Sequence, residues 1–71
     1  MTTGQRIRNR RIEMSLTQEQ LANKIGYNER SAICHIEKGD HSVSIPTLEK
    51  IAEALKCSPA YLAGWSEEVS A

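Results

Sequence analysis

Apolar residues recur every three or four positions along most of this chain, in five short segments separated by Gly, Pro and Ser residues. This spacing predicts amphipathic helices, and no segment shows the strict alternation that is typical of a β-strand. The expected helices cover about residues 4–14, 17–25, 30–38, 45–55 and 59–63. The predicted fold class is therefore all-α, with five helices in one compact domain at 1–65 and a tail or linker start at 66–71.

Residues that begin and end helices mark the second expected helix most clearly. Thr17 can cap its start, and Gln20 stands three residues later, where it would complete a capping box. Leu16 can pack on Leu21 as a hydrophobic staple, and Gly26 is placed to end the helix in the left-handed conformation. Local chemistry therefore predicts both ends of this helix.

The other helices carry similar signals. We expect Asn28 or Glu29 to begin the third helix and Gly39 to end it. The last two helices have caps, early prolines and a final glycine at Ser44, Pro46, Ser58, Pro59 and Gly64. The core predicted from the periodicity consists of Ile7, Leu21, Ala22, Ile25, Ala32, Ile33, Ile36, Ile45, Leu48, Ile51, Ala52, Leu55, Cys57 and Leu62, with Trp65 closing its edge.

The charge of the chain leaves the class of partner open. Nine Lys and Arg balance nine Asp and Glu over the 71 residues, and a net charge of zero argues against a nucleic-acid binder. The charge is nevertheless uneven, since residues 1–38 carry +3 and residues 39–71 carry −3. This asymmetry is compatible with one face directed at a polyanion, and equally with an ordinary mixed surface.

Several classes of protein find no support in the sequence. Two cysteines are too few for a disulfide framework, no apolar run approaches the ~18 residues of a membrane span, and no signal-peptide pattern opens the chain. We therefore expect a cytoplasmic protein with reduced thiols and no membrane contact. No phosphate-binding loop or nucleophile with a plausible base is present, so we expect neither an enzyme nor a small-molecule substrate.

A metal site is also not expected. The side chains that could serve as zinc ligands are those of Cys34, His35, His41 and Cys57. Adjacent residues such as Cys34 and His35 point to different faces of a helix, and the chain has no CxxC pair. We therefore predict no metal and no cofactor.

The third expected helix carries the surface that points to a function. Its apolar face faces the core, and its opposite face presents Arg30, Ser31, Cys34, His35 and Lys38 at spacings of three and four. The DNA major groove is about 12 Å wide and admits one helix that offers hydrogen-bonding side chains. Two short helices joined by a Gly-containing turn form a helix-turn-helix, whose second helix enters that groove. The pattern therefore predicts binding to double-stranded DNA.

Four strings then carry a family resemblance over nearly the whole chain: IRNRRIEMSLTQEQLANKIG at 7–26, RSAICHIEKG at 30–39, TLEKIAEALKCSP at 47–59 and AYLAGW at 60–65. In this order they resemble the Cro/lambda-repressor-like, or XRE-type, helix-turn-helix domains, and most of all the N-terminal domains of phage repressors. The resemblance implies a compact five-helix lambda-repressor-like fold. It also implies a homodimer that represses transcription from a near-palindromic DNA operator. The spacing from Gly26 to Gly39 is one residue longer than the family usually has.

The resemblance also implies roles for individual residues. Gln18 matches a position that contacts phosphate and nearby bases, while Arg30, Ser31 and His35 match base-contacting positions. Arg11 and Glu37 match a buried ion pair between the first and third helices. The whole set of expected DNA-binding residues is Thr17, Gln18, Asn28, Arg30, Ser31, Cys34, His35 and Lys38.

Other interpretations of these residues stay open at this point. Arg30 could contact only phosphate or pair with Glu29, His35 could be a solvated surface residue, and Cys34 could be a small filler or a redox switch. The basic residues of the first helix, namely Arg6, Arg8, Arg10 and Arg11, are expected to flank the DNA backbone. The same fold would also suit an antitoxin, a restriction-modification controller, or a protein-interaction module that has lost DNA binding.

Overall fold

The structure is a computed structural model that describes residues 2–27, 29–39 and 43–65. Within these residues the chain forms five helices and no strand, which confirms the predicted all-α fold. Helix α1 spans Thr3–Glu13, α2 spans Gln18–Lys24, α3 spans Arg30–Lys38, α4 spans Ile45–Ala54 and α5 spans Pro59–Ala63. The predicted bounds were correct to within one or two residues at each end.

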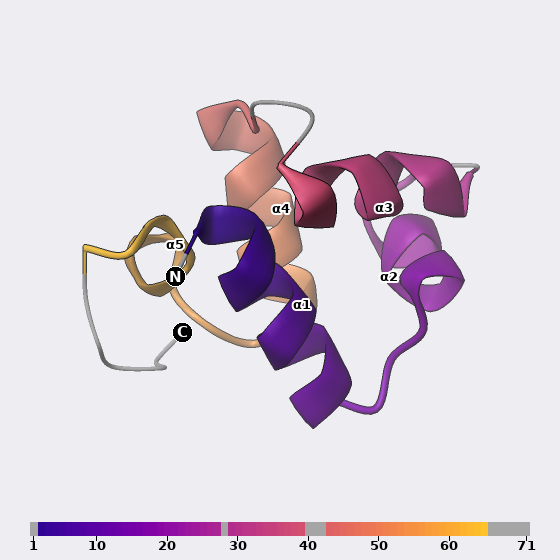
Figure 1. The fold of residues 1–71 in the computed structure, drawn as a ribbon, viewed down its shortest axis with the longest axis horizontal. Helices are drawn as coiled ribbons and strands as arrows, with labels where there is room; N and C mark the ends of the chain where they lie inside the picture. The colour runs from indigo at the N-terminus through magenta and orange to yellow at the C-terminus, as the bar shows by residue number, and fades with distance from the viewer. Residues whose placement is uncertain (1, 28, 40–42, 66–71) are drawn as a thin grey trace.

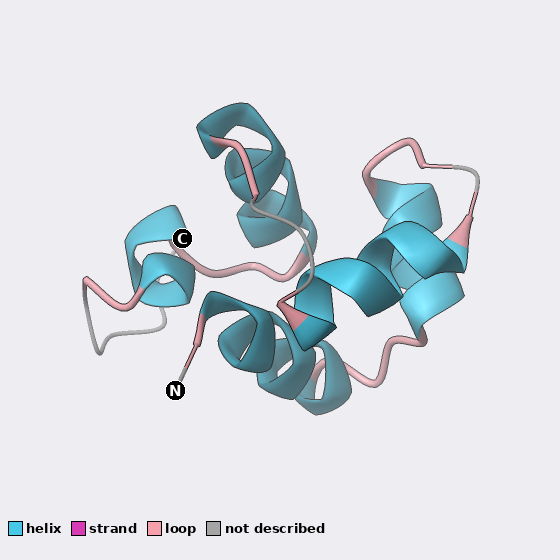
Figure 2. Cartoon of the chain, turned by 45° about the horizontal axis from the view of Figure 1, so that its top comes forward, coloured by secondary structure: helices cyan, strands magenta, loops and turns pink. Residues whose placement is uncertain are grey.

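The helices pack around one apolar core. Helix α2 packs against α3, and α1 lies between α3 and α5, while α4 contacts α5 and α2 (Figure 1). Figure 2 shows the same arrangement from a second angle, with α5 at one end of the molecule and α2 at the other. Every helix contributes to the core, whose fully buried large side chains are Ile7, Leu21, Ile33, Ile51, Leu55 and Leu62.

Three apolar residues expected in the core are not buried in it, namely Ile45, Trp65 and Ala32, of which Ala32 is partly buried. Ile45 is 56% exposed and Trp65 is 77% exposed. Ile45 is the first residue of α4, where a side chain projects beyond the neighbouring helices, and Trp65 follows the glycine that ends α5. The core edge is instead covered by partly buried residues that include Leu16, Tyr27, Val43 and Tyr61.

The predicted helix ends depend on the expected hydrogen bonds. The hydroxyl of Thr17 accepts from the backbone N–H of Gln20, whose side chain accepts from the Thr17 N–H, so the capping box is confirmed. Ser44 and Ser58 cap α4 and α5 with a hydroxyl that accepts from the backbone N–H three residues later, and each is followed by a proline in the first turn. A further capping box, between Thr2 and Gln5 at the start of α1, was not predicted. 

The two glycines that bound the helix-turn-helix have the conformation expected of them. Gly26 and Gly39 both have a φ of +84°, in the left-handed region that L side chains rarely adopt. They end α2 and α3, as the sequence predicted.

Gly4 has a different role, which the sequence did not indicate. It lies in α1, where the backbone of α3 approaches so closely that a Cβ atom would lie 2.5 Å from the carbonyl oxygen of Ile36. The same atom would lie 2.6 Å from the carbonyl oxygen of Glu37. Only a residue without a side chain lets the two helices pack at this distance.

Candidate nucleic-acid interface

The outer face of α3 is the polar surface that the sequence predicted. Arg30, Ser31, His35 and Lys38 are exposed, and Cys34 is partly buried beside them. Ile33 and Ile36 lie on the opposite face and are buried in the core. The helix is therefore anchored by one face and free to present hydrogen-bonding side chains on the other, as entry into a major groove requires.

The start of α3 differs from the expected cap in one respect. Glu29 occupies the N-cap position, but its side chain makes no bond to the helix backbone. Its carboxylate instead accepts a hydrogen bond from the Ser31 hydroxyl at 3.1 Å. Within the described residues Arg30 has no ion pair or hydrogen bond through its side chain, so the suggested Glu29–Arg30 pair is not formed. Asn28, the other expected cap, lies outside the described residues.

The start of α2 lies beside the start of α3. Thr17 and Gln18 line a shallow hollow together with Arg11, Leu16, Glu19 and Arg30. The fold therefore brings together three of the expected DNA-binding residues, Thr17, Gln18 and Arg30, from two helices. The Thr17 hydroxyl also serves as the helix cap, so its oxygen already accepts one hydrogen bond.

An ion pair between Arg11 and Glu37 lies behind this surface. Arg11 Nε donates to Glu37 Oε2 at 2.7 Å and Arg11 Nη2 donates to Oε1 at 3.1 Å, the two-pronged geometry that binds a carboxylate most tightly. The side chains are only 12% and 3% exposed. A third bond runs from Arg11 Nη1 to the carbonyl oxygen of Leu16 at 2.8 Å, and it holds the loop between α1 and α2.

Gln18 is less free than its position at the start of α2 suggested. Its Nε2 donates to Glu37 Oε1 at 3.2 Å, and the side chain is partly buried. This bond was not predicted from the sequence, and the expected contact of Gln18 with DNA stays a prediction. Sequence spacing could not indicate this bond, because Gln18 and Glu37 are 19 residues apart.

Three of the four arginines of α1 make contacts within the protein. Arg10 donates from Nε to the carbonyl oxygen of Leu55 at 2.9 Å and from Nη2 to that of Lys56 at 3.3 Å. Arg6 lies over the ring of Tyr61 at 5.8 Å, and its buried Nε has no hydrogen-bond partner in the described part of the chain. Of the expected basic flank, only Arg8 is exposed to solvent. The other three are held by contacts within the protein, and their place beside a DNA backbone stays a prediction.

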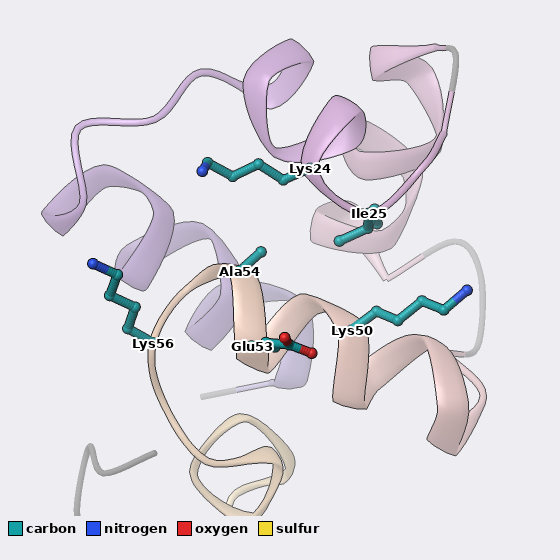
Figure 3. A pocket seen from close by; sticks show the side chains of 6 residues that line it. All are labelled: Lys24, Ile25, Lys50, Glu53, Ala54 and Lys56. Carbon is teal, nitrogen blue, oxygen red and sulfur yellow. The ribbon is translucent and has the colours of Figure 1, made fainter.

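A second hollow lies between the end of α2 and the outer side of α4. Lys24, Lys50 and Lys56 surround it, with Ile25 and Ala54 at its base. The ammonium group of Lys50 points away from those of Lys24 and Lys56, and the Glu53 carboxylate lies among them (Figure 3). Charges that diverge in this way do not enclose an anion, so this hollow is an ordinary charged surface.

A third hollow is apolar. Ile45 and Trp65, the two exposed apolar residues described above, both line it, together with Val43, Ala63 and the N-terminal turn of α1. Figure 1 places α5 and the start of α1 on the side of the molecule away from α2. The hollow is thus separate from the junction of α2 and α3 that carries Gln18 and Arg30.

The two cysteines lie in different environments, one in the core and one on α3. Cys57 is 3% exposed in the core, and burial raises the pKa of its thiol, although the nearby charge of Arg10 opposes part of that rise. Cys34 is a free thiol on α3 and is partly buried. No group of His, Cys, Asp or Glu suited to a metal occurs among the described residues, which leave out His41. None of the helices within those residues is long and apolar enough to span a membrane.

The comparisons with known proteins agree with this geometry. Residues 7–62 match the model of the family described as Helix-turn-helix. The chain is 42% identical over 64 residues to the immunity repressor protein of Bacillus phage phi105, and the match covers 90% of this chain. It spans only 44% of the phi105 protein, which is therefore much longer than the part compared.

Two solved structures share the fold over most of the chain. The P22 c2 repressor, solved in complex with a synthetic operator, has a TM-score of 0.85 and 30% identity over 93% of this chain and 98% of that one. The restriction-modification controller protein C.AhdI of Aeromonas hydrophila has a TM-score of 0.79 and 38% identity over 84% of this chain and 89% of that one. Both structures therefore resemble this chain in sequence as well as in fold.

Proposed function

Because this chain belongs to the helix-turn-helix family of DNA-binding transcriptional regulators, we propose that it represses transcription by binding, as a homodimer, to a near-palindromic operator. The observation that carries the proposal is the outer face of α3, which is polar and exposed while its inner face is anchored in the core. The P22 c2 repressor, which shares the fold, is described as bound to operator DNA. DNA as the ligand also agrees with the expected cytoplasmic location.

The proposed contacts divide into two groups. Arg30, Ser31, Cys34, His35 and Lys38 would face the major groove or its edges from α3, with Arg30 able to donate two hydrogen bonds to guanine O6 and N7. Thr17 and Gln18 would lie at the start of α2, which crosses the backbone in this motif. Asn28 is a proposed contact from sequence alone. The Ser31 hydroxyl already donates a hydrogen bond to Glu29. We therefore expect Ser31 to contribute less than Arg30 to base recognition.

The apolar hollow supports the proposed homodimer. Ile45 and Trp65 expose large apolar side chains on one surface, away from the start of α3. A second copy of the chain would bury both, and the gain is roughly 25 cal/mol for each Å² of apolar surface removed from water. A two-fold dimer would present two copies of α3 to DNA, which is why the operator should be nearly palindromic.

Selection of bound sequences from a random DNA pool tests the proposal. Enriched sequences should contain two inverted half-sites whose centres lie about 10–10.5 base pairs apart, or a multiple of that spacing. The selection can be done at a moderate salt concentration, about 100 mM. Because the net charge of the chain is zero, we expect little non-specific binding to DNA that would need higher salt to suppress. A single asymmetric motif would contradict the dimer, and no enrichment at all would contradict DNA recognition.

The similarity to C.AhdI favours one second candidate, a controller of a restriction-modification system. Such a protein would use the same surface of α3 and the same dimer. The two functions differ in the position of the operator relative to the promoters it controls and in the neighbouring gene. Mapping the enriched sequences to their promoters, with transcription measured in the presence of the protein, separates them.

A further inference from the structure

The side-chain amide of Gln18 is held by the protein in the absence of DNA. Its Nε2 donates to Glu37 Oε1 at 3.2 Å, and this bond joins the first residue of α2 to the last turn of α3. Glu37 is 7% exposed and Gln18 is partly buried, so water has little access to the bond. A hydrogen bond to a charged group in such a place is stronger than one at the surface.

The chemistry of Glu37 determines which end of the Gln18 amide faces it. An ionised carboxylate only accepts hydrogen bonds, so Nε2 must face Glu37 and Oε1 must point elsewhere. Arg11 bonds to both oxygens of the same carboxylate, which prevents the carboxylate from turning with its partner. Gln18 is therefore left with one N–H and one carbonyl oxygen in a fixed orientation, beside Arg30 in the hollow that both line.

We propose that Glu37 is a positioning residue for DNA binding: besides pairing with Arg11, it holds the Gln18 amide in the orientation in which the free N–H of Gln18 is donated to an acceptor on the operator. This inference rests on the proposed function. A free glutamine loses rotational freedom when it is fixed at an interface, and that loss weakens binding by about two- to tenfold. Fixing the side chain beforehand avoids the loss.

A double-mutant cycle tests the role of Glu37. The altered background is Arg11→Met/Glu37→Leu, which removes both charges together and keeps apolar side chains of similar size in their place. Gln18→Ala is then made in the parent and in this background, and operator affinity is measured for all four proteins. Arg30→Ala, made in both backgrounds, is the matched control, because no ion pair or hydrogen bond links Arg30 to Glu37 in the described residues.

We expect Gln18→Ala to weaken operator binding by about tenfold in the parent and by less than threefold in the altered background. Arg30→Ala should weaken binding equally in both. Equal losses from Gln18→Ala in the two backgrounds would overturn the proposal. Failure of the parent itself to enrich any sequence would contradict the proposed function instead, so the two failures are distinguishable. If the acceptor is a base atom, the parent's loss falls on one symmetric pair of base positions; if it is a phosphate oxygen, all sequences lose alike.

A second measurement needs no DNA. In the free parent, the side-chain amide of Gln18 should have a high NMR order parameter, because its hydrogen bond to Glu37 restricts its motion. In the altered background the order parameter of Gln18 should fall, while that of Gln20, held in its capping box, should not change. Arg11→Leu/Glu37→Met serves as a second variant should the first double substitution fail to fold, since it also removes both charges together and leaves no oxygen at position 37 to accept from Gln18. If the order parameter of Gln18 is the same in the parent and in the variant without Glu37, the proposal is contradicted.

Discussion

The guanidinium of Arg11 and the carboxylate of Glu37 meet side by side at the junction of α1 and α3, with N–O distances of 2.7 and 3.1 Å. Both charges are removed from water, so each depends on the other for its solvation. The pair joins the first helix to the helix that we expect to contact DNA. Its integrity therefore affects both stability and the placement of α3.

Glu37→Ala should lower the free energy of unfolding by about 3–5 kcal/mol, because the charge of Arg11 would remain buried without its partner. That is comparable to the whole stability expected of so small a domain, so the variant should be largely unfolded at 37 °C. Thermal and urea unfolding measure the change. The control is Glu13→Ala, whose exposed carboxylate lies 3.6 Å from Arg10 and should matter by less than about 1 kcal/mol. Equal melting temperatures for the parent and Glu37→Ala would contradict the role assigned to the pair.

Gly4→Ala should destabilise the domain by about 1–3 kcal/mol, because the added methyl group would overlap the carbonyl oxygens of Ile36 and Glu37. The sign of the effect is informative. Inside a helix the same substitution ordinarily stabilises by up to about 1 kcal/mol. Urea unfolding compares it with Arg8→Ala, an exposed change on the same helix. A more stable Gly4→Ala variant would show that α1 and α3 can separate at no cost.

Arg30→Ala should weaken binding to the selected operator by about 1–3 kcal/mol and remove the preference at one symmetric pair of base positions. Lys38→Ala serves as a comparison, since a lysine near the end of α3 is placed to neutralise phosphate. It should weaken all sequences evenly and reduce the salt slope by about one. Binding to single-base variants of the operator at two salt concentrations separates these effects. If Arg30→Ala weakens every sequence equally and also flattens the salt dependence, Arg30 contacts only phosphate.

Trp65→Ser and Ile45→Ser should weaken self-association, because both side chains line the apolar hollow proposed as the dimer surface. Ile12→Ser provides a matched control, since Ile12 is 51% exposed but does not line the hollow. Sedimentation velocity over a range of concentrations measures the association constant. We expect a loss of at least tenfold for the first two variants and none for the control. Equal effects from all three would place the dimer surface elsewhere.

The thiol of Cys57 should make stability depend on pH in the alkaline range. Burial raises its pKa above the value of 9.0 for a free thiol, so the unfolded chain loses this proton at a lower pH than the folded chain does. Stability from this group is therefore complete below about pH 9 and falls as the pH rises further. Unfolding of the parent and of Cys57→Ala between pH 7 and pH 10 measures the difference. Parallel pH profiles would show that the thiol ionises equally in both states.

The parts of the fold that were predictable are those that depend on near neighbours in the chain. Thr17 and Gln20 are three residues apart, and their mutual bonds follow from local geometry alone. The predictions for Ile45 and Trp65 were wrong because periodicity identifies an apolar residue but not whether another helix covers it. Both residues lie next to an end of their helix, where neighbouring helices give least cover.

The candidate site was predictable in composition and less so in detail. The outer face of α3 followed from residue spacing, and the Arg11–Glu37 pair followed from the family resemblance. The bond from Gln18 to Glu37 and the inward turn of Arg10 did not follow from either. Their partners lie 19 and 45 residues away, so only the packed structure brings them together.

The bonds from Arg10 to the carbonyl oxygens of Leu55 and Lys56 bear on how this chain acquires its fold during synthesis. The first helix leaves the ribosome early, but the acceptors for its arginine are made about 45 residues later. Helix α1 contacts α3 and α5, so its contacts with α3 can form before those with α5. A nascent chain that stops before Leu55 therefore lacks both acceptors of Arg10 and the helix α5 that α1 contacts.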